Sequence, residues 1–172
     1  MKFLRIFIAI LLMLSFTACV SQSKPDVYEF AGELGAYFGD EINIDDFTVR
    51  KDKQIVYEYL LNPHTLLCLY TDNSGIISQC TLTNDEENVN FYVFCEKIAD
   101  IFCEADKSDV EKIKNGGKIQ IEDYLMVMNV YDVGRTFIIN FADNEINTNT
   151  FPTLKGYIDE KEISRPTAID SP

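Results

Sequence analysis

Histidine and cysteine are the residues of this chain with the most distinctive chemistry, and histidine occurs once. His64 is the only histidine among 172 residues, so a Ser-His-Asp or Cys-His catalytic arrangement would have to use it. The Gly-x-Ser-x-Gly turn of many hydrolases is absent from the sequence, and His64 follows Pro63 where a strand is expected to begin. We therefore expect a turn residue at His64 and predict no catalytic residue.

Four of the five cysteines lie in the body of the chain, without a Cys-x-x-Cys pair among them. A thiolate metal site is therefore not expected, and no metal or other cofactor is predicted. Cys95 and Cys103 fall on one predicted helix, about 12 Å apart along its axis, beyond the ~7 Å limit for a disulfide. Cys68 and Cys80 flank a turn and form the candidate disulfide. The favoured alternative is that both are small buried thiols.

Acidic residues cluster at 40–46 and at 85–87. Neither cluster has the Asp-x-Asp/Asn-x-Asp/Asn-Gly spacing of a calcium-binding EF-hand loop. The second cluster opens a predicted helix, where carboxylates interact favourably with the helix dipole. Neither a calcium site nor a glycosidase-type carboxylate pair is predicted.

The elements that position these residues follow from hydrophobic periodicity and turn residues. Helices are predicted over 25–38, 85–104 and 109–114, and strands over 47–50, 55–61, 65–71, 76–83, 124–131 and 136–141. In the fourth strand, Ile76, Ser78, Cys80 and Leu82 are expected to face the core. Because runs of strands are interrupted by blocks of helix, we predict a two-layer α+β domain. Its antiparallel sheet, a four-strand meander plus a later hairpin, packs against a long helix and an N-terminal helix.

Two sequence pairs have the spacing of a capping box, which marks the start of a helix. Asn84 with Glu87 is expected to begin the long helix, and Ser108 with Glu111 the short one. Asn115-Gly116-Gly117 supplies a stop for the short helix.

The first nineteen residues have the organisation of an export signal. Lys2 and Arg5 precede an apolar run over 6–16, which is too short to span a bilayer. The following Phe16-Thr17-Ala18-Cys19 resembles the lipobox of bacterial lipoproteins, in which Leu usually stands where this chain has Phe16. The resemblance implies cleavage between Ala18 and Cys19 and a diacylglyceryl group on the Cys19 sulfur. Two acyl chains, such as palmitate, anchor a protein stably.

The predicted organisation is a signal peptide over 1–18, a lipidated tether over 19–24, one α+β domain over 25–160 and a loose tail over 161–172. The mature chain would lie at the outer face of the cell membrane. Cleavage removes Lys2 and Arg5 and no acidic residue, so the net charge falls from −13 to −15. Such a charge disfavours nucleic acid and anionic headgroups as electrostatic partners.

The sequence predicts a cell-envelope lipoprotein with a non-enzymatic binding or accessory domain. Its partner would be the membrane, through the anchor, together with a protein or an envelope component. An inhibitor or immunity-type module for a basic protein is the alternative, since the acidic charge suits such a target. A carboxylate- or His64-dependent enzyme is the second alternative. The oligomeric state is left open.

Overall fold

The computed structural model describes residues 25–39, 42–51, 54–85, 89–132 and 134–141. Three α-helices, one short 3₁₀ helix and seven strands lie in these ranges. The helical elements are α2 (Val27–Phe38), η1 (Ile44–Asp46), α3 (Val89–Cys103) and α4 (Lys107–Ile113). The strands are β1 (Thr48–Lys51), β2 (Ile55–Asn62), β3 (Thr65–Thr71), β4 (Ile77–Asn84), β5 (Gly117–Ile121), β6 (Tyr124–Val130) and β7 (Arg135–Phe141).

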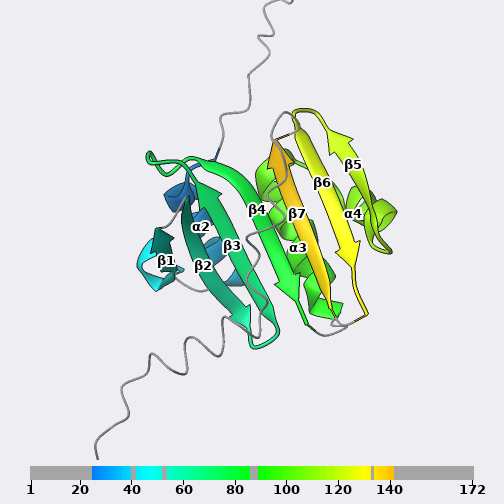
Figure 1. The fold of residues 1–172 in the computed structure, drawn as a ribbon, viewed down its shortest axis with the longest axis horizontal. Helices are drawn as coiled ribbons and strands as arrows, with labels where there is room; N and C mark the ends of the chain where they lie inside the picture. Colours follow the sequence, from blue (N-terminus) through cyan, green and yellow to red (C-terminus); the bar gives the residue numbers. More distant parts are fainter. Residues whose placement is uncertain (1–24, 40–41, 52–53, 86–88, 133, 142–172) are drawn as a thin grey trace, which may run out of the picture.

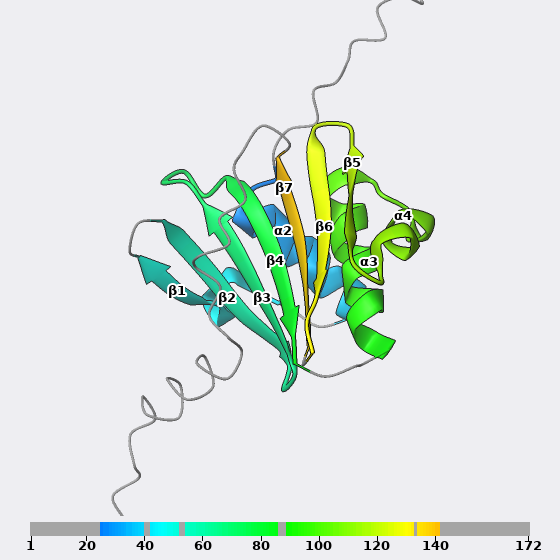
Figure 2. The same ribbon diagram turned by 45° about the vertical axis from the view of Figure 1, so that its right-hand side comes forward.

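All seven strands form one antiparallel sheet in the order β1-β2-β3-β4-β7-β6-β5. The first four are the predicted meander, and the β6–β7 hairpin joins it through the pairing of β4 with β7. The three α-helices lie on one face of this sheet (Figures 1 and 2). The predicted α+β fold with an antiparallel sheet is confirmed.

The helix-bearing face of the sheet is apolar and forms the main core. Directly paired residues of an antiparallel sheet share a face, and one such row on this side is Leu69, Cys80, Ile139 and Met126. These residues cluster with the buried faces of α2 and α3. Phe102 of α3 is central to the contact, because its ring lies 5.1 Å from that of Phe30 and 6.5 Å from that of Tyr124. Both predicted helices therefore pack on the sheet as expected.

The opposite side of the sheet, which we call the far face, is mixed in chemistry. Ten of its side chains are buried. They are Val56, Glu58, Leu66, Cys68, Tyr70, Gln79, Thr81, Thr136, Ile138 and Asn140. Val56, Leu66, Cys68 and Tyr70 form a second, smaller hydrophobic cluster, separate from the main core.

Helix α2 begins and ends close to its predicted limits. Asp26 is the N-cap and its Oδ1 accepts hydrogen bonds from the backbone N–H groups of Tyr28 and Glu29. Gly39 ends the helix in the left-handed conformation, with φ of 72°. The chain before α2 is bonded to β4, since the Ile77 N–H donates to the Pro25 carbonyl at 3.0 Å.

The predicted helix starts at Asn84 and Ser108 are wrong. Asn84 is the last residue of β4, and its Nδ2 donates to Thr65 Oγ1 at 2.8 Å in the sheet interior. Helix α4 is capped instead by Asp106 in a capping box with Asp109, so it begins earlier than predicted. Glu87 lies outside the described residues.

The predicted inward face of β4 is correct only in part. Cys80 and Leu82 lie in the main core, but a register shift between Tyr70 and Thr71 changes the alternation, and Ile77 rather than Ile76 joins them. A β-bulge adds one residue to one strand and so reverses the facing of the residues beyond it.

Candidate functional site

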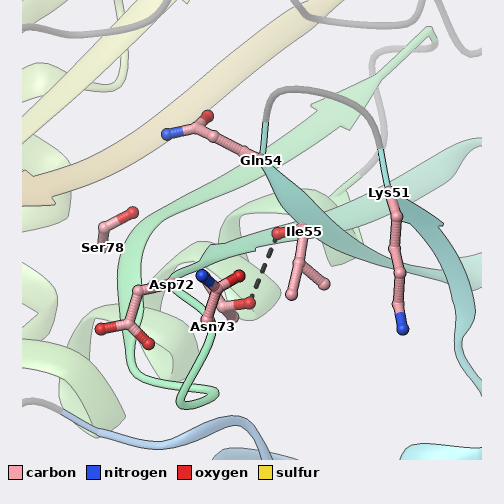
Figure 3. Close-up of a pocket in the computed structure, with 7 residues that line it drawn as sticks. Lys51, Gln54, Ile55, Asp72, Asn73 and Ser78 are labelled. Atoms are coloured by element: carbon pink, nitrogen blue, oxygen red, sulfur yellow. Dashed lines mark hydrogen bonds between the residues drawn. The ribbon is translucent and has the colours of Figure 1, made fainter.

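A shallow polar hollow lies at the end of the sheet where β2 begins and β3 ends (Figure 3). Its volume is about 590 Å³. It is lined by Lys51, Gln54, Ile55, Thr71, Asp72, Asn73 and Ser78. We call it the turn pocket. Lys51 and Ser78 stand on opposite sides of it, because they belong to β1 and β4, with β2 and β3 between.

Three polar side chains of the turn pocket bond to the protein itself. Asp72 Oδ1 accepts from the backbone N–H groups of Ser74 and Ile76 and from Ser74 Oγ, at 2.6 to 3.1 Å. The Ser74 hydroxyl and the other donors hold the pKa of the Asp72 carboxyl below its usual value. Ser78 Oγ donates to the Tyr70 carbonyl at 3.0 Å, and Thr71 Oγ1 to the Ile55 carbonyl at 3.4 Å. These side chains stabilise the walls of the pocket through hydrogen bonds within the protein.

Lys51 and Asn73 are the pocket groups best placed to meet a ligand. Both are exposed, and within the described part of the chain the side chain of neither forms a hydrogen bond or ion pair. The ammonium group of Lys51 offers three donors, and the amide of Asn73 offers donors and an acceptor. Such a pair suits a polar ligand with several hydrogen-bonding groups. In the sequence, Lys51 and Asn73 fall between predicted strands, and the composition of a connecting segment does not indicate which segments lie together in space.

The turn pocket lies next to the point where the chain enters the domain. The Val27 N–H donates to the carbonyl of Gly75, in the same turn as Asp72 and Asn73, at 3.0 Å. Asp26 also forms a β-bridge with Ile76. The start of the domain and one wall of the pocket are therefore held together.

His64 lies at the opposite end of the sheet, paired with a carboxylate. Its Nδ1 is 2.9 Å from Asp85 Oδ1, and both side chains are 40 % exposed. The backbone N–H of His64 donates to Asn62 Oδ1 at 2.8 Å, and this hydrogen bond stabilises the turn. A His-Asp pair acts in acyl transfer only when a serine, threonine or cysteine nucleophile bonds the other ring nitrogen. Asp85 supplies the carboxylate of such an arrangement.

The four cysteines of the domain are buried free thiols. The candidate Cys68–Cys80 disulfide is not formed. Cys68 pairs in register with Thr81 and Cys80 with Leu69, so the two thiols lie on opposite faces of the sheet. Cys95 and Cys103 both lie on the continuous helix α3, as the argument against their pairing requires.

Burial sets the chemistry of these thiols. It raises the pKa of Cys68, Cys80 and Cys95 well above the usual range and that of Cys103 to about 11. Thiolate, rather than thiol, is the nucleophile and metal ligand. These cysteines therefore have the properties of core residues.

The acidic clusters do not form a metal site in the described part of the chain. No group of three or more His, Cys, Asp or Glu side chains is arranged to hold a metal ion there. Asp46 Oδ2 accepts from the backbone N–H of Asn43, and Asp85 pairs with His64. Asp40, Glu41, Glu86 and Glu87 lie outside the described residues.

An ion pair on the far face was not anticipated from the sequence. Arg50 of β1 pairs with Glu58 of β2, whose side chain is 2 % exposed. The sequence does contain a signal for this ion pair, because Glu58 stands between Val56 and Leu60 on one side of an otherwise apolar strand. A charge in such a position indicates a partner on the neighbouring strand.

The predicted anchor residues Ala18 and Cys19 lie outside the described residues, as do the end of the predicted domain at 160 and the tail over 161–172. None of the helices within the described ranges has the length and hydropathy needed to cross a bilayer.

In comparisons with known proteins, no family model, no curated protein and no solved structure matches the chain.

Proposed function

We propose that this chain is a cell-envelope lipoprotein whose domain binds a polar envelope component close to the outer face of the cytoplasmic membrane. Cys19 carries the anchor in this proposal, and residues 19–24 are the tether. Six residues reach about 20 Å at most. The domain is therefore held near the membrane surface.

The observation that carries the proposal is the position of the turn pocket. Its wall is bonded to the first residues of the domain through Gly75 and Val27, so a short tether keeps the pocket on the membrane side. Lys51 and Asn73 supply hydrogen-bond donors and an acceptor there. A peptide or sugar chain of the envelope offers carbonyl and hydroxyl groups of the matching kind.

A binding role is also supported by the state of the reactive groups. The described thiols are buried with raised pKa values, and His64 is paired with Asp85 away from the pocket. Recognition in the turn pocket needs none of these groups.

The test is quantitative capture from the organism's own envelope. The soluble chain 20–172, immobilised as wild type, as Lys51→Ala/Asn73→Ala and as Lys112→Ala, is exposed to solubilised envelope. Lys112 is an exposed lysine of α4, which contacts β5, at the other edge of the sheet from β1. We expect the double variant to lose at least tenfold of the captured material and Lys112→Ala to retain it. Equal capture by all three would contradict the pocket as the binding site.

The inhibitor or immunity-type alternative is favoured by the acidic charge of the chain. The same experiment distinguishes it. Binding to a basic protein would weaken steeply as salt rises from 0.05 to 0.5 M and would be insensitive to Lys51→Ala/Asn73→Ala.

A further inference from the structure

Strand β5 forms one edge of the sheet, and β1, which carries Lys51 of the turn pocket, forms the other (Figure 1). In the hairpin of β5 with β6, the residues that flank the two-residue turn, Ile121 and Tyr124, bond to each other, and every second residue of β5 repeats this bonding. The backbone N–H and C=O groups of Lys118 and Gln120 therefore point away from β6, along the edge. Both residues are exposed, whereas the buried side chains of α4 belong to the main core on the helix side of the sheet.

Charge is distributed unevenly along β5 and its flanks. The segment 112–118 contains three lysines and no acidic residue, whereas 119–124 contains two acidic residues and no lysine or arginine. Two of the lysines pair with acids of α4. Lys118, Glu122 and Asp123 form no ion pair with another described residue. A strand with a basic start and an acidic end is complementary to itself when two copies pair antiparallel.

We propose that a second copy of this chain binds the β5 edge, with the two β5 strands antiparallel and centred on Gln120. The two Gln120 residues then exchange both backbone hydrogen bonds, which uses the groups that point away from β6. Lys118 of each copy lies opposite Glu122 of the other, and Ile119 lies opposite Ile121 on the helix side. Opposite charges and apolar residues that face each other across two strands both stabilise the pairing.

Other registers of the same edge lack this match. Pairing centred on Lys118 would place two lysines directly opposite each other, which is destabilising. Pairing centred on Ile119 would place Lys118 opposite the neutral Gln120 and leave Glu122 without a basic partner. The paired segment, 118–122, is short, so the contact is smaller than the ~800 Å² per partner of a stable complex, and the dimer is reversible. Both turn pockets lie at the outer edges of the joined sheet, where they stay open to a ligand.

Cysteine cross-linking tests the register, because the four native thiols of the domain are buried. In the proposed dimer, the Cα atoms of the two residues at position 120 are about 5.5 Å apart, within reach of a disulfide. Those at position 118 are offset by four residues, or about 14 Å, which is too far. The variants Gln120→Cys and Lys118→Cys of the chain 20–172 are oxidised side by side and analysed on non-reducing gels. We expect Gln120→Cys to form covalent dimers at least tenfold faster than the matched control Lys118→Cys.

Charge reversal provides the second measurement, by sedimentation equilibrium of the chain 20–172 up to millimolar concentration. Lys118→Glu and Glu122→Lys should each lower the association constant at least fivefold, because each creates two like-charge contacts. The double variant Lys118→Glu/Glu122→Lys restores opposite charges and should return the constant to within about twofold of wild type.

Three results would overturn the proposal. They are equal cross-linking rates of the two cysteine variants, a wild-type chain that stays monomeric at millimolar concentration, and a double variant that associates as weakly as the single ones. Circular dichroism melts confirm that each variant is folded. All the substituted positions are exposed, so the melting temperatures should match that of wild type.

Discussion

Arg50 and Glu58 form an ion pair with an asymmetric environment. The Glu58 side chain is 2 % exposed and that of Arg50 is 41 % exposed. If one member of such a pair is removed, the cost depends on how buried the remaining charge is. A buried charge that loses its counter-ion is strongly destabilising, whereas an exposed one is stabilised by water. The two residues therefore contribute differently, although they take part in the same contact.

We predict that Arg50→Ala lowers the free energy of unfolding by about 3 kcal/mol, because it leaves the Glu58 carboxylate buried without its counter-ion. Glu58→Gln should cost only about 1 to 2 kcal/mol, since the guanidinium of Arg50 keeps access to water. Urea melts of the two variants measure both values. The reverse order of the two losses would contradict this assignment.

Asp72 gives a prediction about pH. Its hydrogen bonds with Ser74 lower its pKa in the folded state, so the ionised carboxylate stabilises the fold. That contribution is fully present above the unfolded pKa, 3.8, and is lost as the pH falls through the lower folded value.

Asp72→Ala should therefore lower the urea midpoint at pH 7 and do so less at about pH 2.5. Asn73→Ala, in the same turn, removes no titrating group and serves as the control. A difference between wild type and Asp72→Ala that is the same at both pH values would show that the carboxylate does not act through its charge.

Helix α3 contributes to the fold mainly through one side. Phe102 is 2 % exposed and contacts both α2 and the sheet, whereas Val93 on the same helix is 39 % exposed. Truncating a buried phenylalanine costs the transfer free energy of its atoms and creates a cavity.

We expect Phe102→Ala to lower the free energy of unfolding by about 3 to 5 kcal/mol, while Val93→Ala changes it by less than about 1 kcal/mol. His64→Ala should also cost less than about 1 kcal/mol, because both side chains of its contact with Asp85 are 40 % exposed. Chemical denaturation of the three variants provides the comparison. A near-wild-type midpoint for Phe102→Ala would be incompatible with the packing of α3 on the sheet.

Sequence periodicity predicted three helices and six strands close to their observed positions, because each has a regular apolar side or a run of β-branched and aromatic residues. It missed β5, whose five residues begin at the second of two consecutive glycines, Gly117, and include only Ile119 and Ile121 as large apolar residues. An edge strand buries little and leaves a weak pattern.

The errors at helix starts have a different cause. Asn84 has the residue type and spacing of a cap, but pairing with β3 and β7 and the bond to Thr65 place it in the sheet. Gly134 also packs closely against Asn84, because a Cβ at position 134 would lie 2.2 Å from the Asn84 carbonyl oxygen. Such tertiary contacts join residues far apart in sequence. For the same reason, the turn pocket could not be predicted, because it depends on the adjacency of two hairpin ends.

At the scale of the whole molecule, the decisive prediction concerns attachment. Cys19→Ser should abolish acyl labelling, because serine has no thiol to receive the diacylglyceryl group, and should release the domain or leave it unprocessed. Metabolic labelling with an acyl-chain probe and membrane fractionation measure this. Circular dichroism of the soluble form should match that of the chain 20–172. Acyl labelling that persists in Cys19→Ser would contradict the lipoprotein assignment.

The burial of the four thiols also bears on how fast the chain must fold. In the proposed export, the unfolded chain presents Cys68, Cys80, Cys95 and Cys103 to the oxidants outside the membrane, and packing into the fold then buries them. Cys68 and Cys80 are close in sequence yet end on opposite sides of the sheet, so a bond made between them early would have to be broken before β3 and β4 could pair in register. Folding and oxidation thus compete for the same sulfur atoms. Each of the strands β1 to β4 pairs with the next strand in sequence, which keeps their contacts local. Local contacts speed folding and therefore favour folding over oxidation.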